Sequence, residues 1–386
     1  MPQTSFPAVF MRGGTSKALF FHRADLPPAT PPSDTAAWDP IFLAAIGAPD
    51  PNGRQLNGMG GGVSSLSKIA VIGPPSRPDA DVDYTFAQIG IAEPVVGYRA
   101  NCGNISSAVG PFAVDEGLVA ASGAEAQVRI HNTNTKKIIV AQFPLEDGRA
   151  SCSGDFTLPG VAGTGAPVRL AFTDPGGAVT GQLLPTGQAR ETLTIEGLGS
   201  IGVSMVDAGN PVVFVAAASL DLTATESPDA LASNRRAMHL FEEIRVAAAV
   251  AMGLVRAPEE ARTKMKNLPQ VSLVAAPVAS RTLSGKMLAA EEVDVQTRMV
   301  SMGQPHRATP LTGGMCLAVA ARIDGTIVRD FARPQGPDKD MRVAHPSGIL
   351  VVAARTERVG NTVVAREAVV YRTARRLMDG RVFLPG

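Results

Sequence analysis

The stretch NCGNISSAVGPFAV, residues 101–114, decides which kind of fold this chain can form. From Gly103 onward it is apolar on nearly every face, which predicts a helix that is buried on all sides. Pro111 should kink or shorten that helix, because proline removes one helical hydrogen bond. A helix without a polar face has to be covered by other elements, and the flanking sequence supplies strands.

Strand-like segments run through the rest of the chain, and several alternate at period two, as half-buried antiparallel strands do. Clear examples are residues 82–89 (VDYTFAQI) and 348–357 (GILVVAARTE). Three further segments, residues 32–47, 233–254 and 312–325, are predicted to be helical. This mixture predicts an α+β fold that is rich in short elements.

Two segments with the same pattern indicate an internal duplication. VFMRGGTSKALFF at residues 9–21 and VSMVDAGNPVVFV at 203–215 each place a methionine third, then a glycine turn and an apolar strand. We therefore expect two similar α+β domains, residues 1–190 and 191–386, with the last strand free to return to the first domain. A cleft between two such halves would be a natural ligand site.

Charge and composition exclude several classes of function. The 386 residues carry 36 Lys and Arg against 35 Asp and Glu, a net charge of +1, so no basic surface for nucleic acid or anionic membranes is expected. The sequence shows no secretion signal and no apolar run long enough to span a membrane, so we expect a cytoplasmic protein. Three widely spaced cysteines and five histidines without metal-ligand spacing indicate neither a disulfide framework nor a metal site.

Two glycine-rich loops match phosphate-binding motifs poorly. GMGGGV at residues 58–63 lacks the third glycine of the dinucleotide motif, and GGTSK at 13–17 reverses the order of the Walker motif. Such loops can be flexible turns, or they can line a carboxylate site with bare amides and hydroxyls. The hydroxyl candidates for such a site are Thr15, Ser16, Ser65 and Ser67.

Two residues lie at the starts of predicted buried elements. Cys102 directly precedes the buried helix, where unpaired N–H groups and the positive end of the helix dipole favour a thiolate. Lys68 lies between small residues and the apolar strand 69–72, where a lysine is partly desolvated and suited to proton transfer. The alternatives are a small buried cysteine and a solvated lysine at a strand end. Cys152 lies in a polar loop and is given no role, and Cys316 lies within a predicted buried helix.

Together these segments resemble the PrpF family, which includes 2-methylaconitate cis-trans isomerase, methylitaconate Δ-isomerase and 4-oxalomesaconate tautomerase. The resemblance runs nearly end to end. It is carried by AVFMRGGTSKALFF (8–21), LNGMGGGVSSLSK (56–68), ANCGNISSAVGPFAV (100–114), IHNTNTKKIIVAQF (130–143), DAGNPVVFVAA (207–217), MGQPHRATPLTGG (302–314) and VAHPSGILVV (343–352).

The resemblance implies the diaminopimelate-epimerase-like fold: two similar α+β domains, each a curled, mainly antiparallel sheet around a central helix, with the active site in the cleft between them. It implies a proton shift or cis-trans isomerisation in a small unsaturated di- or tricarboxylate, with no cofactor and no metal. The family's catalytic residues correspond to Lys68 and Cys102, both in the first domain; one removes a proton and the other donates one, in an order that stays open. We expect substrate carboxylates to be bound by the hydroxyl candidates above and by Gly103, Asn104, His306, Arg307 and Ser347, with Arg12 and Lys17 as further cations.

Two alternatives stay open beside this interpretation. An epimerase or racemase would use Cys102 with Cys316, although the duplication aligns Cys102 with Pro310. A non-catalytic carboxylate-binding protein would retain the fold without turnover. Neither nucleic acid nor membrane is expected as a partner, and a homodimer is an open option.

Overall fold

The computed structural model describes residues 3–29, 31, 34–98, 101–334, 336, 339–360 and 362–385. It divides into two compact units: unit 1 comprises Met1–Thr173 and Tyr371–Gly386, and unit 2 comprises Asp174–Val370. As expected, the chain is α+β, with much sheet and few helices. No helix in the described ranges is long and apolar enough to cross a membrane.

The expected domain boundary near residue 190 lies inside unit 2. The segment that precedes residue 190 is tied to unit 2 by hydrogen bonds, because the backbone N–H groups of Val179 and Thr180 donate to the Asp207 carboxylate at 2.8 and 2.7 Å. The last strand of the chain returns to unit 1, where it pairs with the first strand.

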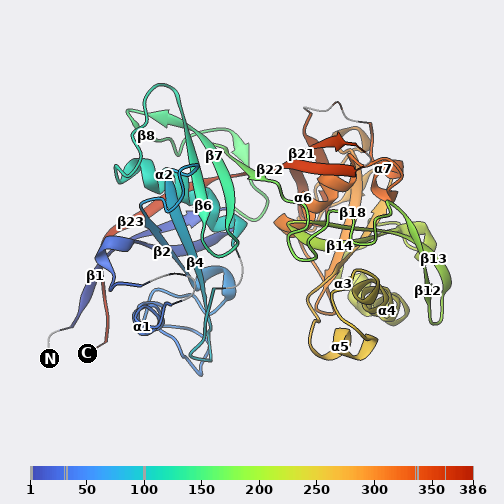
Figure 1. The fold of residues 1–386 in the computed structure, drawn as a ribbon, viewed down its shortest axis with the longest axis horizontal. Helices are drawn as coiled ribbons and strands as arrows, with labels where there is room; N and C mark the ends of the chain where they lie inside the picture. Colours follow the sequence, from blue (N-terminus) through green and yellow to red (C-terminus); the bar gives the residue numbers. More distant parts are fainter. Residues whose placement is uncertain are drawn as a thin grey trace. The chain divides into compact units, whose positions relative to one another are not determined.

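Unit 1 is a sheet that curls around one helix (Figure 1). Helix α2 (Gly103–Asp115) contacts both edge strands of that sheet and strands between them, and its residues from Ile105 to Val114 are all buried. The prediction of a fully buried helix is therefore confirmed. Pro111 does not end the helix, which continues to Asp115, and a kink at this proline stays a prediction. In spatial order the strands are β11 (Val168–Thr173), β7 (Lys137–Glu146), β6 (Glu125–Asn132), β4 (Val82–Ile89), β3 (Lys68–Gly73), β2 (Ser16–His22), β1 (Ser5–Gly13) and β23 (Ala374–Phe383).

Successive residues of β2 show that this sheet has two buried faces. The ring of Phe20 lies 5.3 Å from that of Phe112 in α2, whereas the ring of Phe21 lies 5.8 Å from that of Phe42 in α1 (Asp39–Ile46). Phe20 pairs in register with Ala70 of β3, and Lys68 lies two residues before Ala70, on the same side of the strand because side chains alternate. Lys68 therefore belongs to the face that is covered by α2.

Unit 2 repeats this succession of strand pairings. In unit 1 the pairs β1–β2, β2–β3, β3–β4 and β4–β6 are antiparallel, parallel, antiparallel and parallel. In unit 2 the pairs β13–β14, β14–β15, β15–β18 and β18–β20 follow the same order. The two units therefore share one topology. In spatial order the strands of unit 2 are β12 (Glu191–Ile195), β13 (Gly199–Ala208), β14 (Asn210–Ala216), β15 (Gln270–Ala275), β18 (Val295–Ser301), β20 (Met341–His345), β21 (Gly348–Val359) and β22 (Thr362–Arg372). The last two residues of β22, Tyr371 and Arg372, belong to unit 1.

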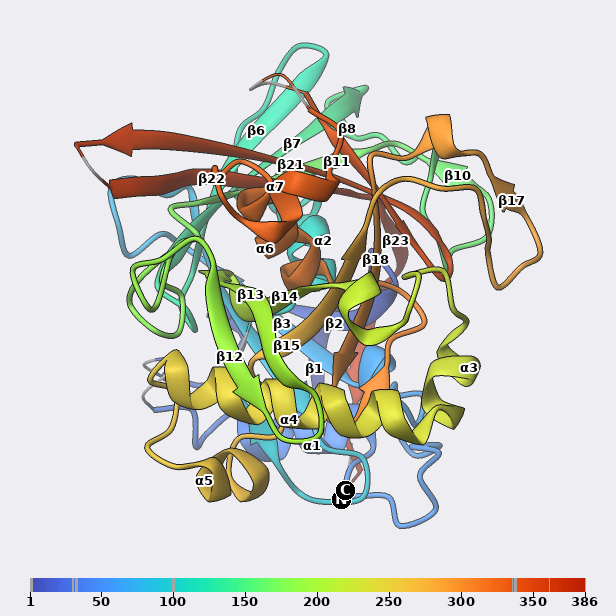
Figure 2. The same ribbon diagram turned by 90° about the vertical axis from the view of Figure 1, so that its right-hand side faces the viewer.

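Helices cover the sheet of unit 2 as well. Helix α6 (Leu311–Ala320) is its buried helix, and α4 (Arg235–Ala251) packs against β12, β14 and β15 (Figure 2). The helices predicted at residues 233–254 and 312–325 are thus present in shorter form. The helix predicted at 32–47 begins only at Asp39, and residues 32 and 33 lie outside the described ranges.

The remaining elements are short. They are β5 (Val96–Gly97), β8 (Arg149–Ala150), β9 (Phe156–Thr157), β10 (Thr164–Gly165), β16 (Ser280–Arg281), β17 (Met287–Leu288), β19 (Gln304–Pro305), α3 (Pro228–Ser233), α5 (Pro258–Thr263), α7 (Ile327–Phe331) and four 3₁₀ turns, η1 (Arg23–Asp25), η2 (Ser64–Leu66), η3 (Ala217–Leu220) and η4 (Ala290–Glu292).

Candidate active site

The turn between β1 and β2 approaches the first turn of α2 closely. A Cβ atom on Gly13 would lie 2.6 Å from the carbonyl oxygen of Asn104, and one on Gly14 would lie 2.3 Å from Asn104 Oδ1. Gly14 also has a φ of +53°, in the left-handed region that favours glycine. This close approach, rather than phosphate binding, explains the two glycines of the R-G-G-T-S-K segment.

The side chain of Asn104 joins this turn to a third segment of unit 1. Its Nδ2 donates to Thr15 Oγ1 at 3.1 Å, and its Oδ1 accepts a hydrogen bond of 3.0 Å from Nε of Arg372. Two predicted residues, Thr15 and Asn104, are thus brought together. Arg372 was not predicted, and its strand gives no clear signal for it, because Ala368, Val369 and Val370 are all buried without alternation.

Cys102 occupies the N-cap position of α2, as predicted, and its side chain is half-buried. Its carbonyl oxygen accepts hydrogen bonds from the backbone N–H of Ser106 at 2.9 Å and from the Ser106 hydroxyl at 3.0 Å. Among the described residues, no side chain is found to cap the start of this helix, which leaves its first N–H groups available to a ligand. Nearby, burial raises the pKa of the Tyr84 phenol well above its usual range, and a charge on Cys102 acts in the same direction. Tyr84 therefore stays neutral near neutral pH, which excludes it as a base.

Lys68 is buried, with 7 % of its surface exposed, rather than solvated at the strand end. Its Nζ donates to Gln88 Oε1 and lies 5.1 Å from the centre of the Phe86 ring. The Gln88 amide is itself held in place, because its Nε2 donates to the carbonyl oxygens of Ser64 at 3.1 Å and Ser67 at 3.0 Å. With both N–H groups engaged there, the amide oxygen is directed toward Lys68.

Lys68 lies along one face of β4, and the segment that carries Cys102 is linked to the same strand. Tyr84, Phe86 and Gln88 alternate along that strand and therefore project to one side, with about 7 Å between successive members. Lys68 contacts Gln88 and Phe86. The segment before α2 is linked to the same strand by Asn132, whose Nδ2 donates to Asn101 Oδ1 at 3.4 Å and to the Tyr84 carbonyl oxygen at 3.5 Å. Both candidate catalytic residues thus belong to segments of unit 1 that are tied to β4.

The three predicted serines near these residues differ in their surroundings. Ser67 is fully buried, and its hydroxyl donates to Gln55 Oε1 at 2.6 Å, so it braces the glycine-rich loop internally. Gln55 Oε1 also accepts from the Gly62 backbone N–H at 3.0 Å. Ser65 is half-buried in η2, and no partner of its hydroxyl is found among the described residues. Ser16 is buried at the start of β2.

Three other predicted residues, His306, Arg307 and Ser347, lie together in unit 2. The Ser347 hydroxyl donates to the Arg307 carbonyl oxygen at 2.6 Å, and His306 Nε2 lies 2.7 Å from Ser301 Oγ. Burial lowers the pKa of His306, which favours its neutral form. The guanidinium of Arg307 forms an exposed ion pair of 3.3 Å with Asp229, a surface interaction that contributes little stability.

Two predicted cations of unit 1 have internal partners. Arg12 Nη1 donates to the Gly14 carbonyl oxygen at 2.9 Å and to the carbonyl and hydroxyl oxygens of Thr373 at 3.0 and 2.9 Å. Arg12 thereby fixes the glycine turn to the chain segment that follows Arg372. Lys17 Nζ lies 5.4 Å from the centre of the Phe10 ring.

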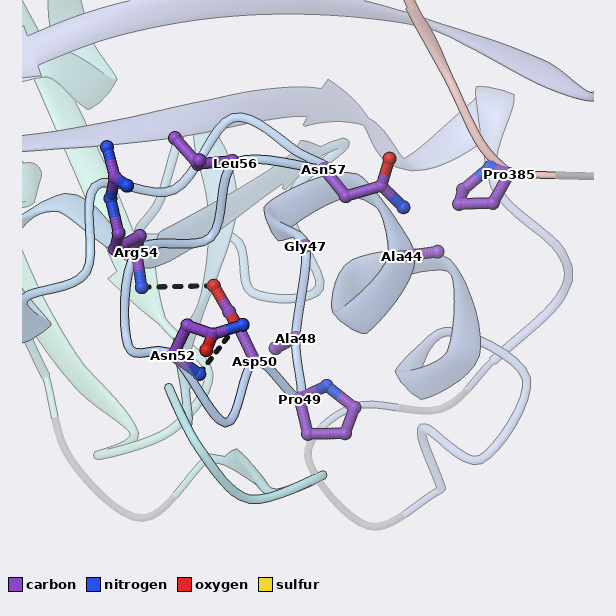
Figure 3. Close-up of a pocket in the computed structure, with 10 residues that line it drawn as sticks. All are labelled: Ala44, Gly47, Ala48, Pro49, Asp50, Asn52, Arg54, Leu56, Asn57 and Pro385. Carbon is purple, nitrogen blue, oxygen red and sulfur yellow. Dashed lines mark hydrogen bonds between the residues drawn. The ribbon is translucent and has the colours of Figure 1, made fainter.

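The cavity shown in Figure 3 lies apart from the candidate residues. It has a volume of about 640 Å³ and is formed by the end of α1, the following loop and the end of the chain. In that loop, Asp50 accepts hydrogen bonds from the backbone N–H groups of Asn52 and Arg54 at 2.8 and 3.0 Å. None of the predicted site residues lines this cavity. Within the described part of the chain, no group of three or more His, Cys, Asp and Glu side chains is placed to hold a metal ion.

We expect Gly14→Ala to lower the free energy of unfolding by roughly 1–3 kcal/mol, because the new methyl group would collide with the Asn104 amide in a strained backbone conformation. Gly148→Ala is the matched control: Gly148 has a φ of +76° but open space around its Cβ position. Urea unfolding should show a clearly smaller loss for the control. Equal losses would mean that the close approach to Asn104 is unimportant.

Known proteins are similar to this chain over nearly its whole length. The model of the PrpF protein family matches residues 3–385. The chain belongs to the PrpF protein family. Among curated PrpF-like relatives, it is 40% identical to 3-methylitaconate isomerase of Eubacterium barkeri over 383 residues, which cover 99% of this chain and 98% of the relative. It is also 40% identical to 2-methyl-aconitate isomerase of Cupriavidus necator over 393 residues, which cover 100% and 98%.

Solved structures agree with this PrpF assignment. The crystal structure of methylitaconate-delta-isomerase superposes with a TM-score of 0.91 at 40% identity and covers 100% of this chain and 96% of that one. A hydroxyproline epimerase from Agrobacterium vitis, 12% identical, matches at a TM-score of 0.54 over 99% of this chain and 93% of its own, which shows a shared fold. The expectations of a PrpF-family isomerase and of an epimerase-type α+β fold are confirmed.

Proposed function

We propose that this PrpF-family isomerase moves a proton across the three-carbon allylic unit of a small unsaturated di- or tricarboxylate, without a cofactor. The substrate class is that of the relatives, whose names refer to methylitaconate and methylaconitate. The observation that supports the proposal is that Cys102 caps the start of α2, while the buried Lys68 lies on the sheet face that α2 covers. This arrangement offers two proton-transfer groups and an anion-stabilising helix end.

In the proposed reaction, one of the two groups removes a proton from the carbon next to the alkene. The negative charge spreads into the adjacent carboxylate, and the other group donates a proton to the far carbon; rotation before reprotonation gives cis-trans isomerisation instead. The open N–H groups at the start of α2 and the Thr15 hydroxyl are placed to stabilise the charge as it develops. Either residue can take either role.

The surroundings of Lys68 fix the position of its Nζ atom. Its hydrogen-bond partner Gln88 is a neutral amide, and no ion pair of Lys68 is found among the described residues. The fixed Gln88 amide restricts where Nζ can lie, as proton transfer requires.

The environment of Cys316 argues against the two-thiol alternative. Cys316 is fully buried in α6, and its Sγ donates to the Val206 carbonyl oxygen at 3.3 Å. Burial raises the pKa of this thiol far above its usual range, which disfavours the thiolate. These contacts are those of a core residue.

The test is a panel of 3-methylitaconate, the 2-methylaconitates and 4-oxalomesaconate, followed by proton NMR in D₂O. An isomerase exchanges solvent deuterium into an allylic position of at least one compound and accumulates product. A racemase would place deuterium at a stereocentre only, and a binding protein would exchange no carbon-bound proton. Either of those two outcomes would refute the proposal.

We expect the activity to survive extensive dialysis against EDTA, because the proposed chemistry uses only side chains and backbone groups of unit 1. The rate on whichever panel compound is turned over should match that of an undialysed sample. A loss of rate that a divalent cation restores would contradict cofactor independence.

A further inference from the structure

Arg372 combines deep burial with an incomplete set of partners. Only 6 % of its surface is exposed, and burial lowers the pKa of its guanidinium to about 10, an effect that the charge on Cys102 partly opposes. Its Nε donates to Asn104 Oδ1 at 3.0 Å, and its Nη1 donates to the Tyr371 carbonyl oxygen at 2.8 Å. Both acceptors are neutral, so the positive charge is not compensated by either.

No acidic side chain among the described residues forms an ion pair with Arg372. This is costly, because an unpaired buried charge destabilises a folded protein by several kcal/mol. A guanidinium carries five N–H groups, and the two hydrogen bonds above use two of them. For the three that are left, on Nη1 and Nη2, no partner is found among the described residues, and a guanidinium with free N–H groups on both atoms can bind a carboxylate.

The partners of Arg372 place it at the candidate active site. Asn104, which accepts from its Nε, is the second residue of α2 and lies two positions after Cys102, the N-cap residue. Gly14 completes the arrangement, since a Cβ there would lie 3.1 Å from Arg372 Cδ as well as 2.3 Å from the Asn104 oxygen. The turn of the R-G-G-T-S-K segment is thus shaped around the Asn104–Arg372 pair.

We propose that Arg372 binds the substrate carboxylate at the Cys102 end of the allylic unit, an assignment that rests on the function proposed above. The carboxylate supplies a hydrogen-bonded countercharge that no acidic side chain among the described residues supplies, and it lies against the open N–H groups of α2. Charge that develops on the allylic unit during proton transfer is delocalised into a carboxylate, so the same contact strengthens as the reaction proceeds. Arg372 would therefore act on substrate binding and on the rate of proton transfer.

The test measures binding separately from turnover. Isothermal titration calorimetry with 3-methylitaconate and 2-methylaconitate is carried out on the wild type, Arg372→Met, Arg372→Lys and Arg375→Met. Arg375 is the matched control, because it lies three residues further along the chain, is exposed and has no ion pair among the described residues. We expect affinity to fall about 10²-fold or more in Arg372→Met and less in Arg372→Lys, which keeps the charge but loses the guanidinium. Arg375→Met should bind like the wild type.

Thermal unfolding without ligand shows whether a loss of affinity comes from a folding defect. We expect Arg372→Met to melt at or above the wild-type temperature, because it removes an uncompensated buried charge. If this variant does not fold, Arg372→Lys decides: wild-type affinity there overturns the proposal. Wild-type affinity in a folded Arg372→Met also overturns it.

The outcomes separate this proposal from the proposed function. A wild type that binds a panel compound through Arg372 but exchanges no carbon-bound proton would refute the isomerase and leave the carboxylate anchor standing. A wild type that isomerises while Arg372→Met retains its affinity would refute the anchor alone. Absence of wild-type binding to both compounds would refute the anchor.

Discussion

Replacing Cys102 with serine should lower turnover by about 10²-fold or more while the protein stays folded, the usual effect of losing a positioned acid or base. Serine has nearly the same volume, and the hydrogen bonds that Ser106 donates go to the backbone carbonyl of Cys102, which the substitution leaves in place. A serine hydroxyl, however, is a far weaker acid than a thiol. Initial rates on the compound that the wild type turns over, together with the melting temperature, measure both expectations.

Cys152→Ser is the control for this substitution. Cys152 is also a free cysteine, but it is exposed and lies outside α2 and its N-cap. We expect its rate to equal that of the wild type. A Cys102→Ser enzyme with the rate of the control would remove Cys102 from the mechanism.

Replacing Lys68 with methionine should lower kcat by about 10²-fold or more and leave KM nearly unchanged, because the lost group moves a proton rather than only neutralising a carboxylate. The methionine side chain fills the space next to the Phe86 ring. The Gln88 oxygen loses its donor, which costs roughly 1–3 kcal/mol of unfolding free energy. Steady-state kinetics and urea unfolding measure these effects.

A lysine of the protein surface provides the comparison. Lys264 is exposed and forms only a surface ion pair of 3.3 Å with Glu260. Lys264→Met should therefore keep both kinetic constants. If Lys68→Met instead raised KM and kept kcat, Lys68 would be a binding residue and not an acid or base.

Local patterns in the sequence predicted the elements that carry the candidate site. The apolar character of residues 103–114 predicted α2, and the change from small to apolar residues at Lys68 predicted the start of β3. Both signals lie within one element, so they can be recognised without knowledge of the fold. The duplication was recognisable for the same reason, because residues 9–21 and 203–215 form the matching hairpins β1–β2 and β13–β14.

Contacts between distant segments could not be predicted in this way. Arg372 reaches Asn104 from 268 positions along the chain, and nothing in the sequence pairs the two residues. Gln88 likewise faces Lys68 only because β3 and β4 pair in one register. Ser67 is a residue whose predicted partner differs from the one observed. Its hydroxyl was predicted to bind a substrate carboxylate, but it donates to Gln55 within the loop. The partners of a polar side chain depend on strand register and loop conformation, which local patterns do not encode.

The central claim, that Lys68 and Cys102 exchange protons with opposite ends of one allylic unit, is tested most directly by NMR of deuterium incorporation in D₂O. Lys68→Met and Cys102→Ser are incubated with the compound that the wild type isomerises, and exchange is followed at each carbon. We predict that the wild type exchanges protons at both ends, and that each variant loses exchange at a different carbon while net isomerisation nearly stops. Exchange at both carbons in either variant, or loss at the same carbon in both, would contradict the account.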